Sequence, residues 1–95
     1  MTMIQFNTAV LAKQKGFTQT NATQSQLQKW LREKHNIHML MKIFVGDKVT
    51  YVCDVVSVNE DVFKRLLPRN TYEQALEQAL VNGLNYIKRY ETTPL

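Results

Sequence analysis

Two helix-start motifs bracket a single apolar, β-branched stretch, and this arrangement constrains the fold more than any other feature of the sequence. The motifs are Thr23-Gln24-Ser25-Gln26 and Thr71-Tyr72-Glu73-Gln74, and the β-branched stretch is Ile37–Val58. In each motif the threonine hydroxyl can accept a hydrogen bond from the amide three residues on, and the glutamine side chain can reach back to the threonine amide. The chain therefore reads as helix, β-hairpin, helix, preceded by one more helix.

Helical spacing of the apolar residues predicts three helices. The first covers Gln5–Lys15, and the second covers Gln24–His35 with Trp30 as the anchor of its buried face. The third is expected from Tyr72 to about Arg89 and carries a broad apolar stripe on one side. Gly83 lies within that stripe, and because glycine disfavours a helix by roughly 1 kcal/mol relative to alanine, we expect close packing there.

Composition predicts two strands, Ile37–Val45 and Lys48–Val58, joined as a hairpin. A two-residue turn at Gly46-Asp47 has the better turn chemistry. A three-residue loop at 46–48 gives the cleaner separation of faces. It joins alternate residues of the two strands in one apolar row, namely Ile37, Met39, Met41, Ile43 and Val45 with Val49, Tyr51, Cys53 and Val55. The sequence leaves both registers open.

Residues 59–70 are also open to two interpretations. The apolar residues Val62, Phe63, Leu66 and Leu67 fit either a third short strand or one helical turn. Helical spacing slightly favours the turn, with Asn59 as its cap. The fold class predicted for residues 1–95 is a single α+β domain. It has two N-terminal helices, a β-hairpin, the option of a third short strand, and a long C-terminal helix packed on the sheet. Residues 91–95 are expected to form a loose tail.

Length and composition favour a soluble cytoplasmic domain. The chain has 95 residues, 44% of them hydrophobic, and no apolar run approaches the roughly 20 residues that span a bilayer. The first residues lack the basic start and the continuous apolar core of a signal peptide. A single cysteine, Cys53, excludes an internal disulfide framework and fits a reducing compartment.

The second face of the predicted sheet bears on function. Both registers leave Leu40 and Phe44 on that face, and short helices cover one face of a small sheet more readily than two. If the first helix does not wrap onto this face, a partner has to cover it, and a second copy of the chain is the commonest partner. We therefore expect self-association or another protein partner, with Leu40 and Phe44 in the contact.

The net charge of +4 invites a nucleic-acid interpretation. Basic residues are spread along the chain with acidic residues between them, so no basic arm is present. The alternative site is the second helix, where Lys29, Arg32 and Lys34 carry the positive charge. A mixed helix face of this kind is more often simply solvated, so nucleic-acid binding is the second candidate.

No constellation predicts catalysis, a metal or a cofactor. His35 and His38 lie at a helix end and in a strand, so their rings are expected to point apart rather than share a metal ion. Cys53 lies in a valine-rich strand, where a lone cysteine is usually a small core residue. The carboxylates of Asp54, Glu60 and Asp61 have no lysine at a useful spacing, and the glycines are too scattered for a phosphate loop. We expect a protein that is not an enzyme.

Two blocks of sequence carry a resemblance. Residues 26–38 (QLQKWLREKHNIH) and 71–76 (TYEQAL), with Phe6 and the step at 12–17 (AKQKGF), resemble a group of short uncharacterised proteins carried by bacteriophages, prophages and mobile elements of gut bacteria. The resemblance spans most of the chain and departs at residues 16–23 and 59–70, which it marks as loops. It implies a phage or mobile-element origin and an α+β fold, and it implies no activity. The function expected from sequence is that of a non-enzymatic accessory protein acting by protein–protein interaction, with a homodimer as one arrangement.

Overall fold

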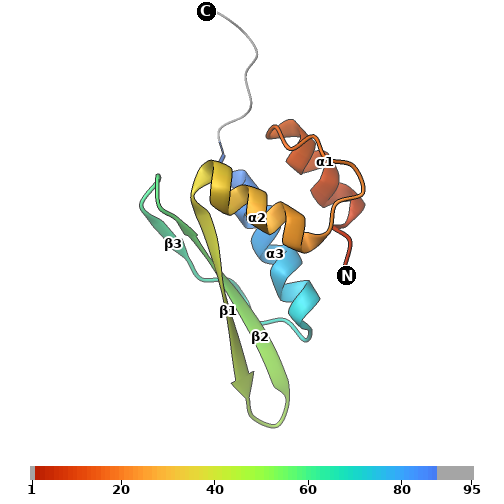
Figure 1. The fold of residues 1–95 in the computed structure, drawn as a ribbon. Coiled ribbons are helices and arrows are strands. Elements are labelled where there is room, and N and C mark those ends of the chain that lie inside the picture. The colour runs from red at the N-terminus through yellow and green to blue at the C-terminus, as the bar shows by residue number, and fades with distance from the viewer. Residues whose placement is uncertain (1, 88–95) are drawn as a thin grey trace, which may run out of the picture.

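The computed structural model describes residues 2–87 and shows an α+β fold with three helices and one three-stranded sheet (Figure 1). The elements, in chain order, are α1 Phe6–Gln14, α2 Gln24–His35, β1 Ile37–Val45, β2 Val49–Ser57, β3 Val62–Lys64 and α3 Tyr72–Asn85. The sheet order is β1-β2-β3, and both neighbouring pairs are antiparallel. The predicted tail at 91–95, and Lys88 and Arg89 of the predicted third helix, lie outside the described residues.

The capping motifs begin α2 and α3 where the sequence predicts. At α2 the motif is complete: Gln26 N–H donates to Thr23 Oγ1 at 3.2 Å, and Thr23 N–H donates to Gln26 Oε1 at 2.8 Å. At α3 only the hydroxyl half forms, from Gln74 N–H to Thr71 Oγ1 at 3.1 Å. The structure does not show the return bond expected from the Gln74 side chain.

The hairpin adopts the three-residue loop. Val45 pairs with Val49, Ile43 with Tyr51 and Met41 with Cys53. The odd-numbered residues of both strands therefore share one face, as the cleaner of the two sequence registers requires. The two-residue turn at Gly46-Asp47 is wrong, because the apolar alternation of the two strands outweighs the local turn preference.

Helices α2 and α3 pack on the odd-numbered face of the sheet. Ile37, Cys53 and Val55 are at most 2% exposed and belong to one core with buried residues of the helices. Gly83 of α3 permits the closest approach, since a Cβ there would lie 2.9 Å from Met39 Cε and 3.2 Å from Ile37 Cγ2. The close packing expected at this glycine is confirmed. None of the helices within residues 2–87 has the length and hydropathy to cross a membrane.

The first helix packs against the other helices and not on the second face of the sheet. Figure 1 shows α1 beside α2 and α3 at one end of the molecule, while the distal half of the hairpin extends beyond them. A buried cluster holds this end together: Glu77 accepts from Gln5 N–H at 2.8 Å and from Gln24 Nε2 at 2.9 Å. The second face of the sheet is therefore left without a helix.

Residues 62–64 form a strand, so the preference for a helical turn in segment 59–70 is wrong. Ser57 pairs with Val62 and Val56 with Phe63, so backbone pairing with β2 takes the place of local helical bonds. Asn59 does not cap a helix; its Nδ2 donates to His35 C=O at 3.3 Å. The chain then meets β2 again through paired hydrogen bonds between Tyr51 and Arg69.

Candidate interaction surface

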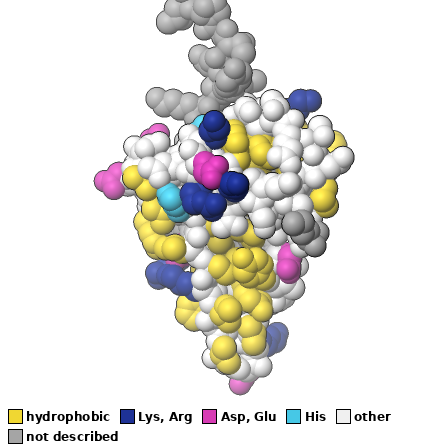
Figure 2. Space-filling view, in the orientation of Figure 1, with side chains coloured by type: hydrophobic (Ala, Val, Ile, Leu, Met, Phe, Trp, Pro, Cys, Tyr) yellow, Lys and Arg dark blue, Asp and Glu magenta, His cyan; other side chains and the backbone are white. Residues whose placement is uncertain are grey.

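The surface that stands out is the side of the sheet opposite the helices, which we call the helix-free face. Register assigns to it the even-numbered residues of β1 and β2 together with Phe63 of β3 and the next alternate residue, Arg65. Three large hydrophobic side chains on it are about half exposed: Leu40 (47%), Phe44 (53%) and Phe63 (54%). Strand register brings the two residues expected at a partner contact, Leu40 and Phe44, to this one face. Figure 2 shows hydrophobic side chains on the hairpin below α2, down towards its tip.

A buried carboxylate lies in the middle of this face. The Asp54 side chain is fully buried, with Lys42 Nζ 2.9 Å and Arg65 Nε 3.9 Å from its Oδ2 atom. Neither carboxylate oxygen has a hydrogen bond of good geometry within residues 2–87, so the attraction is that of an ion pair. Lys42 Nζ also lies 5.9 Å from the Phe63 ring centroid, a distance at which cation and ring attract. Asp54 therefore organises the cations and the aromatic ring above it.

A shallow pocket of about 290 Å³ opens beside this ion pair. It is lined by Lys42, Phe44, Thr50, Val52, Arg65 and Pro68. Val52 is only 6% exposed although no helix covers it, because the segment after β3 returns along this side of the strand. The pocket offers apolar walls and two cationic groups, the combination that suits an apolar segment carrying a carboxylate.

Sequence reasoning missed Lys42, Arg65 and Phe63 as members of this face. Lys42 is an isolated charge in an apolar strand, and that placement is a usable signal for a paired partner on the neighbouring strand. Arg65 and Phe63 depend on β3, which the sequence did not separate from a helical turn.

The basic residues predicted on the second helix are all exposed, and Lys29 and Arg32 are one turn apart on it. Lys29 and Lys34 border a hollow over Trp30 together with Glu33, whereas Arg32 does not line it. Trp30 packs against the rings of Phe17 and His35, with ring centroids 5.2 Å and 4.7 Å apart. Glu33 lies among these cations, so the exposed side of the helix is of mixed charge.

The two histidines and the cysteine considered above for metal binding or catalysis have other surroundings in the structure. His38 Nε2 lies 2.7 Å from Asn36 Oδ1, while partial burial beside Trp30 lowers the pKa of His35. Burial, and secondly the charge of Asp54, raise the pKa of the buried Cys53 thiol to about 12, so the nucleophilic thiolate is disfavoured. Within residues 2–87 no group of three histidine, cysteine, aspartate or glutamate side chains is placed to hold a metal ion.

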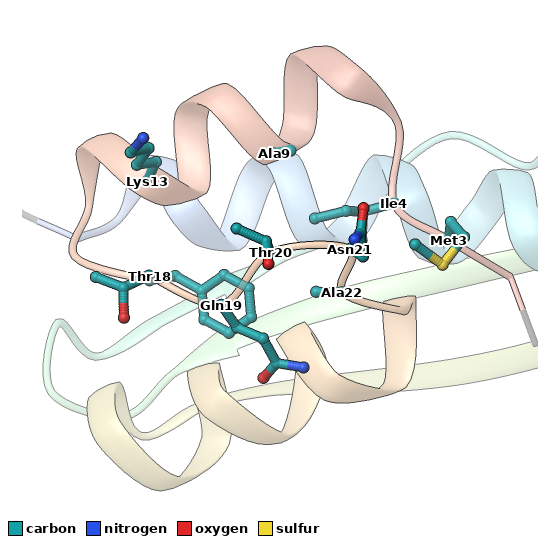
Figure 3. Close-up of a pocket in the computed structure, with 10 residues that line it drawn as sticks. Met3, Ile4, Ala9, Lys13, Thr18, Gln19, Thr20, Asn21 and Ala22 are labelled. Atoms are coloured by element: carbon teal, nitrogen blue, oxygen red, sulfur yellow. The ribbon is translucent and has the colours of Figure 1, made fainter.

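A third hollow, of about 270 Å³, lies between α1 and the connector to α2 (Figure 3). Small and polar side chains line most of it, including Ala9, Thr18 and Thr20, and Lys13 is the one ionisable residue among them. The close-up shows the lining drawn from α1, the connector and the N-terminal stretch. Lys13 lies in this hollow beside the hydroxyl-bearing Thr18 and Thr20.

Comparison of the chain with protein-family models, with curated proteins and with solved structures found no match.

Proposed function

We propose that this protein acts by binding another polypeptide chain through the helix-free face of its sheet, without catalysing a reaction. The observation that carries the proposal is the row of half-exposed hydrophobic residues Leu40, Phe44 and Phe63 on a face that no helix covers. Large apolar side chains that share one face of a small domain are typical of contact sites. The partner is a second copy of the chain or a different protein.

The charged residues on the same face support a specific contact rather than non-specific hydrophobic association. Lys42 lies between Leu40 and Phe44 on β1, Arg65 lies beside the same carboxylate, and the one acidic side chain of this face, Asp54, is buried. Charged groups among apolar contacts fix the orientation of a partner and exclude unsuitable ones. The phage or mobile-element origin stays a prediction from the sequence resemblance.

Affinity capture of a tagged copy, with and without nuclease, tests the class of function. The proposal expects the tagged chain to retain a protein partner after nuclease treatment and in high salt. That partner is either an untagged copy of the chain or a different protein. Loss of all retained protein on nuclease treatment, together with recovery of nucleic acid, would contradict it. Sedimentation equilibrium of the purified chain then separates self-association from binding to a different protein.

Nucleic-acid binding by α2 is the second candidate, because Lys29 and Arg32 are both exposed and one turn apart. Each phosphate contact releases counterions, so such binding weakens steeply with salt. The double variant Lys29→Ala and Arg32→Ala would abolish nucleic-acid retention under this candidate and would leave it unchanged under the main proposal.

A further inference from the structure

The outer edge of β1 presents free backbone hydrogen-bonding groups. Val58 N–H donates to Asn36 C=O at 3.1 Å, so the even-numbered residues of β1 direct their backbone groups towards β2. The odd-numbered residues Met39, Met41 and Ile43 direct theirs outward. No backbone group within residues 2–87 bonds to them, because β1 is the edge of the sheet.

This edge lacks the protection that edge strands usually carry. β1 is nine residues long, contains no proline, and pairs with β2 without a bulge. Its one lysine, Lys42, is held over Asp54 rather than directed outward as a free charge. The distal part of the strand is also well exposed, with Ile43 at 60% and Val45 at 80%.

The residues of β1 on the helix-free face determine which side chains an added strand should carry. A strand added beside β1 places every second residue next to Leu40, Lys42 and Phe44 in turn. The half-buried Lys42 and the exposed Arg65 on this face have no exposed acid between them, since Asp54 is fully buried. The residue beside Lys42 is therefore best acidic, and those beside Leu40 and Phe44 are best apolar.

We propose that β1 binds an extended segment of another protein as an additional strand, with an apolar–x–acidic–x–apolar pattern. The pattern is the same in both directions, so parallel and antiparallel pairing satisfy the same contacts. Backbone hydrogen bonds along the edge supply general affinity, and Lys42 with Arg65 selects the carboxylate. This inference rests on the proposed function and names the chemistry of its partner.

The charges favour this occupant over the two others. Packing two copies face to face sets Lys42 and Arg65 of one copy against the same cations of the other, which repel. Single-stranded nucleic acid would neutralise the cations but would leave the outward amides of Met39, Met41 and Ile43 without partners. An extended polypeptide with an acidic residue pairs with the outward backbone groups of β1 and also places a carboxylate beside Lys42 and Arg65.

The test uses the full chain and two synthetic peptides, acetyl-Ser-Val-Thr-Glu-Thr-Val-Ser-amide and the same peptide with lysine in place of glutamate. Calorimetry at low salt measures affinity, and two-dimensional NMR follows the backbone amides of β1. The glutamate peptide is expected to bind roughly five- to tenfold more tightly than the lysine peptide, with shifts concentrated on Met39–Val45. Equal affinity for both peptides, or no binding of either, would overturn the proposal.

A matched pair of variants separates the contribution of the backbone N–H at the β1 edge from that of the side chain. Ile43→Pro removes one outward N–H and no bond to β2, while Ile43→Thr keeps that N–H and removes much of the apolar side chain. The proline variant should lose at least about tenfold in peptide affinity, and the threonine variant should stay within about threefold. If the proline variant does not fold, Arg65→Gln serves instead, because Arg65 is 70% exposed; it should remove the preference for glutamate.

The remaining outcomes are also decisive. Binding of an oligothymidylate probe without binding of either peptide would overturn the proposal in favour of nucleic acid. Concentration-dependent protection of the Met41 and Ile43 amides in the chain alone, without peptide binding, would overturn it in favour of a second copy. If the peptides fail while protein capture still depends on Phe44, this inference falls and the proposed function stands.

Discussion

The ion pair of Asp54 shows how single residues shape the helix-free face. A carboxylate with no solvent exposure is costly unless a cation lies close to it, and Lys42 at 2.9 Å is the nearest one. Arg65 is farther, at 3.9 Å, and is mostly exposed. Lys42 therefore has a structural task as well as the proposed part in partner recognition.

Removing the lysine charge should destabilise the fold. We expect Lys42→Met to lower the free energy of unfolding by about 1–3 kcal/mol, because Asp54 stays buried with a weaker partner. Adding Asp54→Leu to that variant should recover most of the loss, since it removes the buried charge. Chemical denaturation measures the free energy of unfolding of the single and the double variant. A Lys42→Met variant as stable as the wild type would contradict the role of Lys42 as the partner of the buried Asp54 carboxylate.

Cys53 allows a test of burial at the residue scale. Its raised pKa means that the folded state keeps the thiol protonated at pH values where the unfolded chain loses the proton. Its contribution to stability is therefore complete below its ordinary pKa of 9.0 and declines as the pH rises towards about 12. Iodoacetamide at mildly alkaline pH should label Cys53 only in the unfolded chain. Rapid labelling of the native protein, at the rate of Ser25→Cys in a Cys53→Ala background, would contradict this.

At the scale of elements, α3 depends on one close contact with the sheet. Gly83→Val should lower stability by about 1–3 kcal/mol, because the new side chain meets Met39 and Ile37 where even a Cβ is crowded. Thermal unfolding measures this effect, with Asn85→Val, exposed in the same helix, as the control. Equal melting temperatures for the two variants would contradict the packing described here.

The elements that the sequence predicts well are those with local signals. Capping motifs fix the starts of α2 and α3, and strand alternation fixes the faces of β1 and β2. The hairpin register stays open in the sequence because alternation and turn chemistry favour different loops, and β3 depends on pairing with β2, which no pattern within residues 59–70 contains. For the same reason Leu40 and Phe44 were predicted at the contact face, whereas Arg65 and Phe63 were not.

At the scale of the whole molecule, the helices lie together on one side and the sheet is left open on the other. The buried hydrogen bonds of Glu77 to Gln5 and Gln24 secure α1 against the helical end of the molecule. That placement makes the hydrophobic residues of the helix-free face available to a partner. The central claim is that this face, and not the rest of the surface, binds another protein.

One comparison tests the claim most directly. Phe44→Asp places a charge on the helix-free face, and Phe6→Asp makes the same change at an exposed phenylalanine of α1, on the other side of the fold. Quantitative capture of partner protein after nuclease treatment is expected to persist for wild type and Phe6→Asp. For Phe44→Asp it should fall at least about tenfold, as expected when a central apolar contact is lost. Equal capture by Phe44→Asp and Phe6→Asp, with both variants folded, would contradict the account.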